Sequence, residues 1–214
     1  LVSILSVAAL VGAGVTSAQF LAAGTDATAF DGLYRADAFS SFAKILIYIA
    51  AAVALVIAPK ALEKMGAMRA EYPVLVVLAA VGMGIMVSAS DLLTLYIGLE
   101  LNSLAAYVLA SFARNDGRSA EAGLKYFVLG ALASGILLYG ISLTYGFTGT
   151  TGYAGIAKAF SAAGADVLIA DLKGDLARAT ANAIEKETER KCRGIACDVT
   201  KEDDIQATVA MALR

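Results

Sequence analysis

The chain has 214 residues, of which 59 % are apolar, 17 % are charged and none is histidine. Soluble domains are usually about 45–50 % apolar and about 25 % charged, so this composition argues against a conventional soluble enzyme. A net charge of −2 provides no basic surface for nucleic acid, and without histidine the usual zinc ligand and proton carrier are missing, so we expect neither a nucleic-acid partner nor a metal site.

The charges are unevenly distributed along the chain. Residues 1–150 carry nine acidic and eight basic side chains, whereas the much shorter segment 151–214 carries ten and nine. This contrast predicts two domains, a transmembrane helix bundle at 1–150 and a small soluble domain at 151–214.

Five apolar runs in the first domain are long enough to cross a bilayer, which takes about 20 helical residues. In chain order they are Leu1–Leu21, Phe39–Ala58, Tyr72–Ser90, Leu92–Phe112 and about 126–147. Pro59 is expected to end the second run. The sequence therefore predicts a mainly α fold, with a polytopic bundle of about five transmembrane helices.

Basic side chains gather in two of the connections, after the second run (60–69) and after the fourth run (114–118). Short loops rich in Lys and Arg stay on the cytoplasmic side of a membrane. We therefore expect these two loops to face the cytoplasm and the segment after Phe147 to emerge on the opposite side.

Glu100 is the one acidic residue well inside an apolar run, where an ionised side chain costs about 2.5–3.5 kcal/mol on insertion scales. One helical face carries four polar residues, at spacings of four, three and four: Tyr96, Glu100, Ser103 and Tyr107. A carboxylate on such a stripe could pass protons. Alternatively, it could be a protonated packing group.

Three other charged residues lie near the ends of the runs. Lys44 is expected to extend its ammonium to the interface, and Asp91 is expected to cap the fourth helix. Lys125, at the head of the fifth helix, could extend to the interface in the same way or hold a proton.

The stretch 88–104, SASDLLTLYIGLELNSL, resembles the glutamate-bearing helix of a known family. The family is the antiporter-like subunit N of bacterial proton-pumping NADH:quinone oxidoreductase, respiratory complex I, and the resemblance covers residues 1–157. It implies proton transport driven by quinone reduction elsewhere in the complex. Glu100 matches the family's membrane-embedded glutamate, and Lys125 matches a lysine at the head of the next helix, so the resemblance implies a proton relay through both.

The same resemblance implies a multi-pass protein of the bacterial inner membrane, with other membrane subunits of complex I and the lipid bilayer as its partners. NADH and quinone would be used by the whole complex, and no cofactor is expected on this chain. The family's later helices have no counterpart in the sequence, so we expect a fragment of the subunit that is not catalytic alone.

The soluble domain alternates between helical and strand patterns, which predicts a small, incomplete α/β unit with parallel strands. The predicted elements are a helix at Ala154–Ala163, a strand at Ala165–Ala170, a helix at 174–189, a strand at Gly194–Val199 and a helix at Glu202–Leu213. The middle helix is expected to bury one face, formed by Leu176, Ala179, Ala183 and Ile184.

Residues of about 154–214 resemble an internal fragment of a short-chain dehydrogenase, which has a Rossmann fold. By this resemblance Asp171 would bind the adenosine ribose of NAD, and Asp198 and Val199 would lie beside the adenine. The family's glycine-rich phosphate loop and its Tyr/Lys catalytic pair are missing, so the resemblance implies only a vestigial NAD site. Two alternatives stay open: an NAD-dependent dehydrogenase fragment, or a non-functional chimera of two families meeting near 149–160.

Overall fold

The computed structural model describes residues 1–213, and the chain divides into two compact units, Leu1–Ile141 and Ser142–Arg214. Four helices are long and apolar enough to cross a membrane, and a further apolar helix is shorter. The expected mainly α membrane bundle is therefore confirmed.

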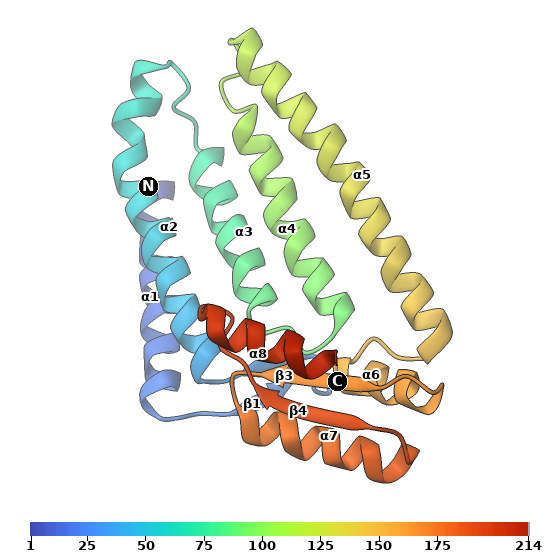
Figure 1. Ribbon diagram of the computed structural model, residues 1–214. Helices are drawn as coiled ribbons and strands as arrows, with labels where there is room; N and C mark the ends of the chain where they lie inside the picture. Colours follow the sequence, from blue (N-terminus) through green and yellow to red (C-terminus); the bar gives the residue numbers. More distant parts are fainter. Residues whose placement is uncertain (214) are drawn as a thin grey trace. The chain divides into compact units, whose positions relative to one another are not determined.

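The first unit consists of helices and one small hairpin (Figure 1). Its elements are α1 (Val2–Ala22), β1 (Ala27–Ala29), β2 (Tyr34–Ala36), α2 (Ala38–Lys64), α3 (Glu71–Met86), α4 (Leu92–Ala110) and most of α5 (Gly117–Thr148). Helix α1 packs against α2, and α3 packs against α4, so neighbouring helices in the sequence are also neighbours in space. The antiparallel pairing of β1 with β2 was not predicted.

The interior of this unit is narrow, because most large apolar side chains point outward. Its main cluster joins α1, α2 and α3 through Leu10, Ala51, Leu55 and Ala80. Side chains such as Val56 and Leu129 are largely exposed. An apolar exterior around hydrogen-bonded helices is the arrangement that a bilayer requires.

Helices α3 and α4 approach so closely that their backbones touch. A Cβ atom on Gly98 would lie 2.8 Å from the carbonyl oxygen of Gly82 and 2.9 Å from Cγ of Met86. A Cβ on Gly82 would lie 2.6 Å from the backbone nitrogen of Asn102. Small residues at helix contacts allow such close packing, and here they are Gly82 of α3 and Gly98 of α4.

Three helix boundaries differ from the sequence prediction by four residues or more. Helix α2 continues past Pro59 to Lys64, so the prediction that proline ends it is wrong. The turn after the proline buries Leu62 in a cluster with Ala67 and Phe112, which offsets the lost backbone hydrogen bond.

Helix α3 ends at Met86 and not at Ser90, because the residues that follow it bond to the hairpin. The amide of Arg35 donates to the carbonyl of Ser88 at 2.8 Å, and the amide of Ser90 donates to the carbonyl of Leu33 at 3.0 Å. These hydrogen bonds occupy the carbonyl of Ser88 and the amide of Ser90, which a longer α3 would have needed for its own hydrogen bonds.

Helix α5 begins at Gly117, nine residues before the predicted start at Tyr126. The Asp116 side chain accepts a hydrogen bond from the amide of Arg118 at 3.0 Å, and this satisfies one free donor at the new helix start. Lys125 therefore lies inside α5 and not at its head.

Lys44 is buried, with 7 % of its surface exposed, so its ammonium ends against other protein groups and not in open solvent. Its Nζ donates to the hydroxyl oxygen of Tyr34 in β2 at 2.6 Å. The hairpin supplies this partner, and no local pattern around Lys44 could have indicated it.

The second unit contains the end of α5, α6 (Tyr153–Ala162), β3 (Val167–Asp171), α7 (Gly174–Thr188), β4 (Cys192–Ala196) and α8 (Glu202–Ala212). Strands β3 and β4 are parallel and pair from Val167 with Cys192 to Asp171 with Ala196. A small core of Ala181, Ile184 and Cys192 lies where α7 covers the sheet. The alternation of helices with parallel strands agrees with the α/β pattern in the sequence.

Three details of the second unit were predicted wrongly. Strand β3 begins at Val167, two residues after the predicted start at Ala165. Strand β4 begins at Cys192, two residues before the predicted start at Gly194, and ends at Ala196. Val199 therefore lies outside the strand and is 77 % exposed. Helix α7 buries Ala177, Ala181 and Ile184, of which only Ile184 was expected. The reason is Gly194 in β4, where a Cβ would collide with the backbone of Ala177, so this turn of α7 lies directly on the strand.

Candidate functional site

The helix that carries Glu100 is fixed at its start by Asp91. The Asp91 Oδ1 atom accepts hydrogen bonds from the amides of Leu93 at 2.8 Å and Thr94 at 3.1 Å. The predicted cap of α4 is thus confirmed. Glu100 lies nine residues after this cap, in the middle of α4, and is half-buried.

A hydroxyl from the neighbouring helix binds the Glu100 carboxylate. Ser134 of α5 donates its hydroxyl hydrogen to Oε1 of Glu100. The Ser134 oxygen also lies 2.9 Å from the hydroxyl oxygen of Tyr96, one turn before Glu100 on α4. Since a serine hydroxyl has one hydrogen, Tyr96 is the donor in this second bond. The order of donation is Tyr96 to Ser134 to Glu100.

This three-member chain can reverse its direction. If Glu100 takes up a proton, its carboxyl group becomes a donor to Ser134, and Ser134 can then donate to Tyr96. Each of the three oxygens therefore keeps a hydrogen-bond partner in both states, and in the reversed state the Tyr96 hydroxyl hydrogen is left for an acceptor outside the chain. The arrangement therefore suits a carboxyl group that gains and loses a proton.

Tyr107 extends the same face of α4 toward α5. It is buried, and its ring packs edge-on against the rings of Tyr126 at 4.7 Å and Phe127 at 5.7 Å between centroids. The predicted polar face therefore meets α5 at Tyr96, Glu100 and Tyr107, whereas the hydroxyl of Ser103 has no hydrogen bond among the described residues.

Ser134 was not found from the sequence. A hydroxyl in a membrane helix commonly bonds to the backbone of its own helix, as Thr148 does with the carbonyl of Thr144 at 2.8 Å. The pairing of Ser134 with Glu100 depends on how α4 and α5 rotate against each other. The sequence offers no signal for that rotation.

The structure does not bring Lys125 to Glu100. Its side chain is 69 % exposed and forms an ion pair with Glu121, one turn earlier on α5. An exposed pair of this kind contributes little to stability, at most about 1 kcal/mol. A proton-relay role for Lys125 stays a prediction.

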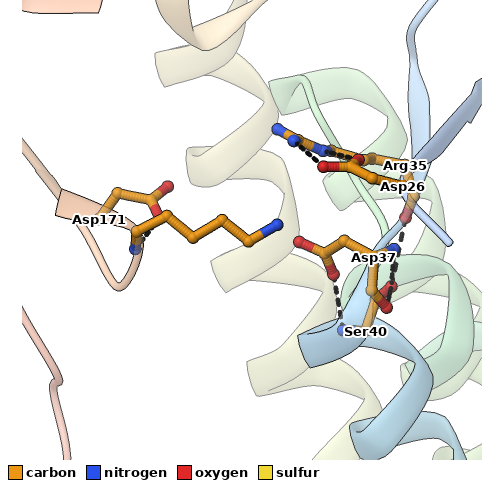
Figure 2. A network of polar contacts seen from close by, with 6 residues as sticks. Asp26, Arg35, Asp37, Ser40 and Asp171 are labelled. Atoms are coloured by element: carbon orange, nitrogen blue, oxygen red, sulfur yellow. Dashed lines mark hydrogen bonds and ion pairs between the residues drawn. The ribbon is translucent and has the colours of Figure 1, made fainter. Parts of the chain in front are cut away.

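The candidate NAD residues lie at the carboxyl ends of the two parallel strands, where Rossmann folds bind nucleotides. The Asp171 Oδ1 atom accepts a hydrogen bond from the amide of Lys173 at 2.8 Å (Figure 2). Asp198 accepts bonds from the Thr200 hydroxyl at 2.7 Å and the Thr200 amide at 3.1 Å.

These local bonds from Thr200, together with nearby Lys201, hold the pKa of Asp198 below its ordinary value. The carboxylates of Asp171 and Asp198 thus form hydrogen bonds within the turns that follow β3 and β4. The segment that leads into α6 is helix α5, whereas a phosphate-binding loop requires a strand before it.

Across residues 1–213, the acidic and cysteine side chains form no group of three or more that could hold a metal ion.

Two family models match the chain. One, described as NADH:quinone oxidoreductase/Mrp antiporter, TM, matches residues 89–174. The other, described as Enoyl-(Acyl carrier protein) reductase, matches residues 152–214. The first match includes α4, Glu100 and Ser134. The second covers the segment in which the sequence indicated a nucleotide-binding fragment.

The similar proteins include subunit N of NADH-quinone oxidoreductase from two bacteria. The Erythrobacter litoralis protein is 66 % identical over 164 residues, covering 75 % of this chain and 34 % of that protein. The Rhizorhabdus wittichii protein is 69 % identical over 140 residues, covering 65 % of this chain and 29 % of that protein. The chain thus spans about a third of the length of these relatives.

Solved structures also resemble the chain. A chain of respiratory complex I from Thermus thermophilus, with bound aureothin, is 31 % identical with a TM-score of 0.59, over 76 % of this chain and 38 % of that one. A chain of the archaeal membrane-bound sulfane sulfur reductase is 21 % identical with a TM-score of 0.62, over 87 % and 37 %. The second likeness concerns the fold alone. The expected resemblance of the membrane part to subunit N is confirmed.

Proposed function

We propose that residues 1–157 act within a proton-translocating membrane subunit of NADH:quinone oxidoreductase, because they resemble subunit N of that complex. The observation that carries the proposal is Glu100, a carboxyl group in mid-helix with a reversible hydrogen-bond chain to the next helix. In this role quinone reduction elsewhere in the complex drives the transport. The complex uses NADH and quinone, and the other membrane subunits are the partners of this chain.

In the proposed mechanism Glu100 receives a proton from one side and releases it to the other. The Tyr96–Ser134 pair donates toward Glu100 while its carboxylate is charged and accepts from it while it is protonated. Lys125 is proposed as a second proton-holding group. It lies nine residues before Ser134 on α5, about 13 Å along the helix axis, so ordered water would have to connect it to Glu100.

The proposed setting is the bacterial inner membrane, with the loops after α2 and α4 on the cytoplasmic side. This orientation rests on the basic residues in and beside these loops: Lys60 in the last part of α2, Arg69 and Arg114 in the loops, and Arg118 at the start of α5.

The proposal can be tested by exchange into an intact complex. Subunit N of Rhodobacter capsulatus, 52 % identical over 155 residues, would have its matching segment replaced by residues 1–157. We expect the hybrid complex to assemble and to pump protons into inverted membrane vesicles when NADH is added. Assembly and NADH oxidation without pumping would contradict the proposal. A complex lacking the segment provides the baseline.

A second candidate function is NAD binding by the tail, which the match to residues 152–214 and the parallel strands β3 and β4 favour. We expect the full chain to give no binding heat with NAD in titration calorimetry, because the strand and glycine loop that hold the phosphates are missing. Binding tighter than about 1 mM would contradict this expectation. Loss of that binding in Asp171→Ala would then assign it to the vestigial site.

A further inference from the structure

The ammonium of Lys44 is buried in α2 with a single hydrogen-bonded partner. Its Nζ donates to the Tyr34 hydroxyl at 2.6 Å and lies 4.6 Å from the centroid of the Tyr34 ring. An ammonium has three N–H donors, so two remain for another acceptor. The Tyr34 hydroxyl, which accepts from Lys44, also keeps its own hydrogen to donate.

Two acidic residues of the hairpin region, Asp26 and Asp37, bond to other groups. Asp26 holds Arg35 through two bonds of 2.8 and 2.7 Å, and Asp37 accepts from the amide of Ser40 at 2.8 Å (Figure 2). Within residues 1–213 no carboxylate forms an ion pair with Lys44. A buried charge without a counter-charge is strongly unfavourable, so a bound anion would stabilise the Lys44 ammonium.

A cavity of about 360 Å³ lies beside this ammonium, between α1, the hairpin and α2. Most of its apolar lining residues are alanines, and its polar lining comes from Lys44, Tyr34, Tyr48, Ser41, Thr16, Ser17 and Thr28. Thr16 and Ser17 already donate their hydroxyl hydrogens to the carbonyl of Ala13. The free donors of Lys44 and Tyr34 therefore favour an anionic ligand.

The cavity lies near the end of α2, where a membrane-spanning helix would meet the lipid headgroups. Lys44 is six residues after the start of α2, so it lies about 9 Å along the helix from that end. Tyr34, in the hairpin next to this end of α2, and Tyr48 both line the cavity. Tyrosine side chains gather at membrane interfaces, where phospholipid phosphates also lie.

We propose that this cavity binds the phosphate of an anionic phospholipid, with Lys44 and Tyr34 as its donors. The acyl chains would then lie along the exposed apolar faces of α1 and α2. A free phosphate ion has the same donor requirements, but the apolar lining and the interfacial depth favour the lipid.

The test uses the full chain in vesicles of phosphatidylcholine with a minor fraction of phosphatidylglycerol. After mild detergent extraction, native mass spectrometry should find phosphatidylglycerol retained on the wild type. Retention should fall at least about tenfold in Lys44→Met and stay unchanged in Lys64→Met, a matched change at the exposed end of α2. Equal retention in Lys44→Met and the wild type, or none in the wild type, would overturn the proposal.

Two further arms complete the test. Ala13→Phe fills the cavity while keeping Lys44, so it should also lose the lipid, and circular dichroism would verify that each variant keeps its helices. This variant tests the proposal even if Lys44→Met fails to fold, because retained lipid in Ala13→Phe would overturn it. Inorganic phosphate added during extraction should not displace the lipid; its stoichiometric replacement of phosphatidylglycerol would identify a free-anion site instead.

Discussion

Replacing Glu100 by glutamine is expected to abolish proton translocation by a complex that carries residues 1–157 in its subunit N. Glutamine preserves the size of the side chain and can still bond to Ser134, but it cannot take up or release a proton at neutral pH. Pumping should therefore fall to the passive leak, whereas helix packing should be unaffected. The measurement is NADH-driven acidification of inverted vesicles, followed with a pH-sensitive dye.

The matched control is Glu63→Gln, which removes one carboxylate from the exposed last turn of α2. This variant should pump at the wild-type rate, because Glu63 lies away from the α4–α5 contact. Undiminished pumping by Glu100→Gln, in a complex that contains the variant subunit at normal levels, would eliminate the relay role of Glu100.

Replacing Gly98 by leucine is expected to destabilise the first unit by about 3 kcal/mol, at the upper end of overpacking effects. The new Cβ would lie 2.8 Å from both the carbonyl oxygen of Gly82 and the backbone nitrogen of Met86. Backbone atoms cannot rotate away as a side chain can, so α3 and α4 must separate. The loss would be measured as earlier unfolding in a denaturing detergent, followed by far-ultraviolet circular dichroism.

A second helix glycine provides the control for this substitution. A Cβ on Gly135 of α5 would meet no heavy atom within 4 Å. Gly135→Ala should therefore leave the fold intact and add about 0.5–1 kcal/mol, the usual difference in helix propensity. If Gly98→Leu unfolds at the same detergent concentration as the wild type, the close contact of α3 with α4 does not contribute to stability.

The sequence was sufficient for the features that depend on neighbours along the chain. Apolar runs identified the membrane helices, and Asp91 identified the start of α4 because capping is a local interaction. The spacing of Tyr96, Glu100 and Tyr107 identified the face of α4 that meets α5.

Features that depend on distant parts of the chain were missed. The end of α3 follows from bonds between Ser88 and the backbone of Arg35, more than fifty residues earlier. The environment of Lys44 depends on Tyr34 in a hairpin whose strands have three residues each. Such short strands give too few positions for an alternating pattern to be recognised.

The alanine-rich sequence of α7 shows a different limit. Ala177, Ala179, Ala181 and Ala183 are chemically identical, so hydrophobic periodicity cannot tell which of them face the sheet. The choice is made by Gly194 on the opposing strand, where the helix backbone comes closest. A property of β4 therefore decides the orientation of α7.

The bonds between the hairpin and the turn after α3 also have a mechanical meaning. The β-bridge between Tyr34 and Ala89, together with the backbone hydrogen bond from Arg35 to Ser88, links the α1–α2 pair to the α3–α4 pair. A rigid-body tilt of either pair would be transmitted to the other through this link. Helix α5, by contrast, meets α4 through side chains such as Ser134. The hydrogen bond from Ser134 to Glu100 therefore lies where the four linked helices meet a fifth helix that can tilt separately.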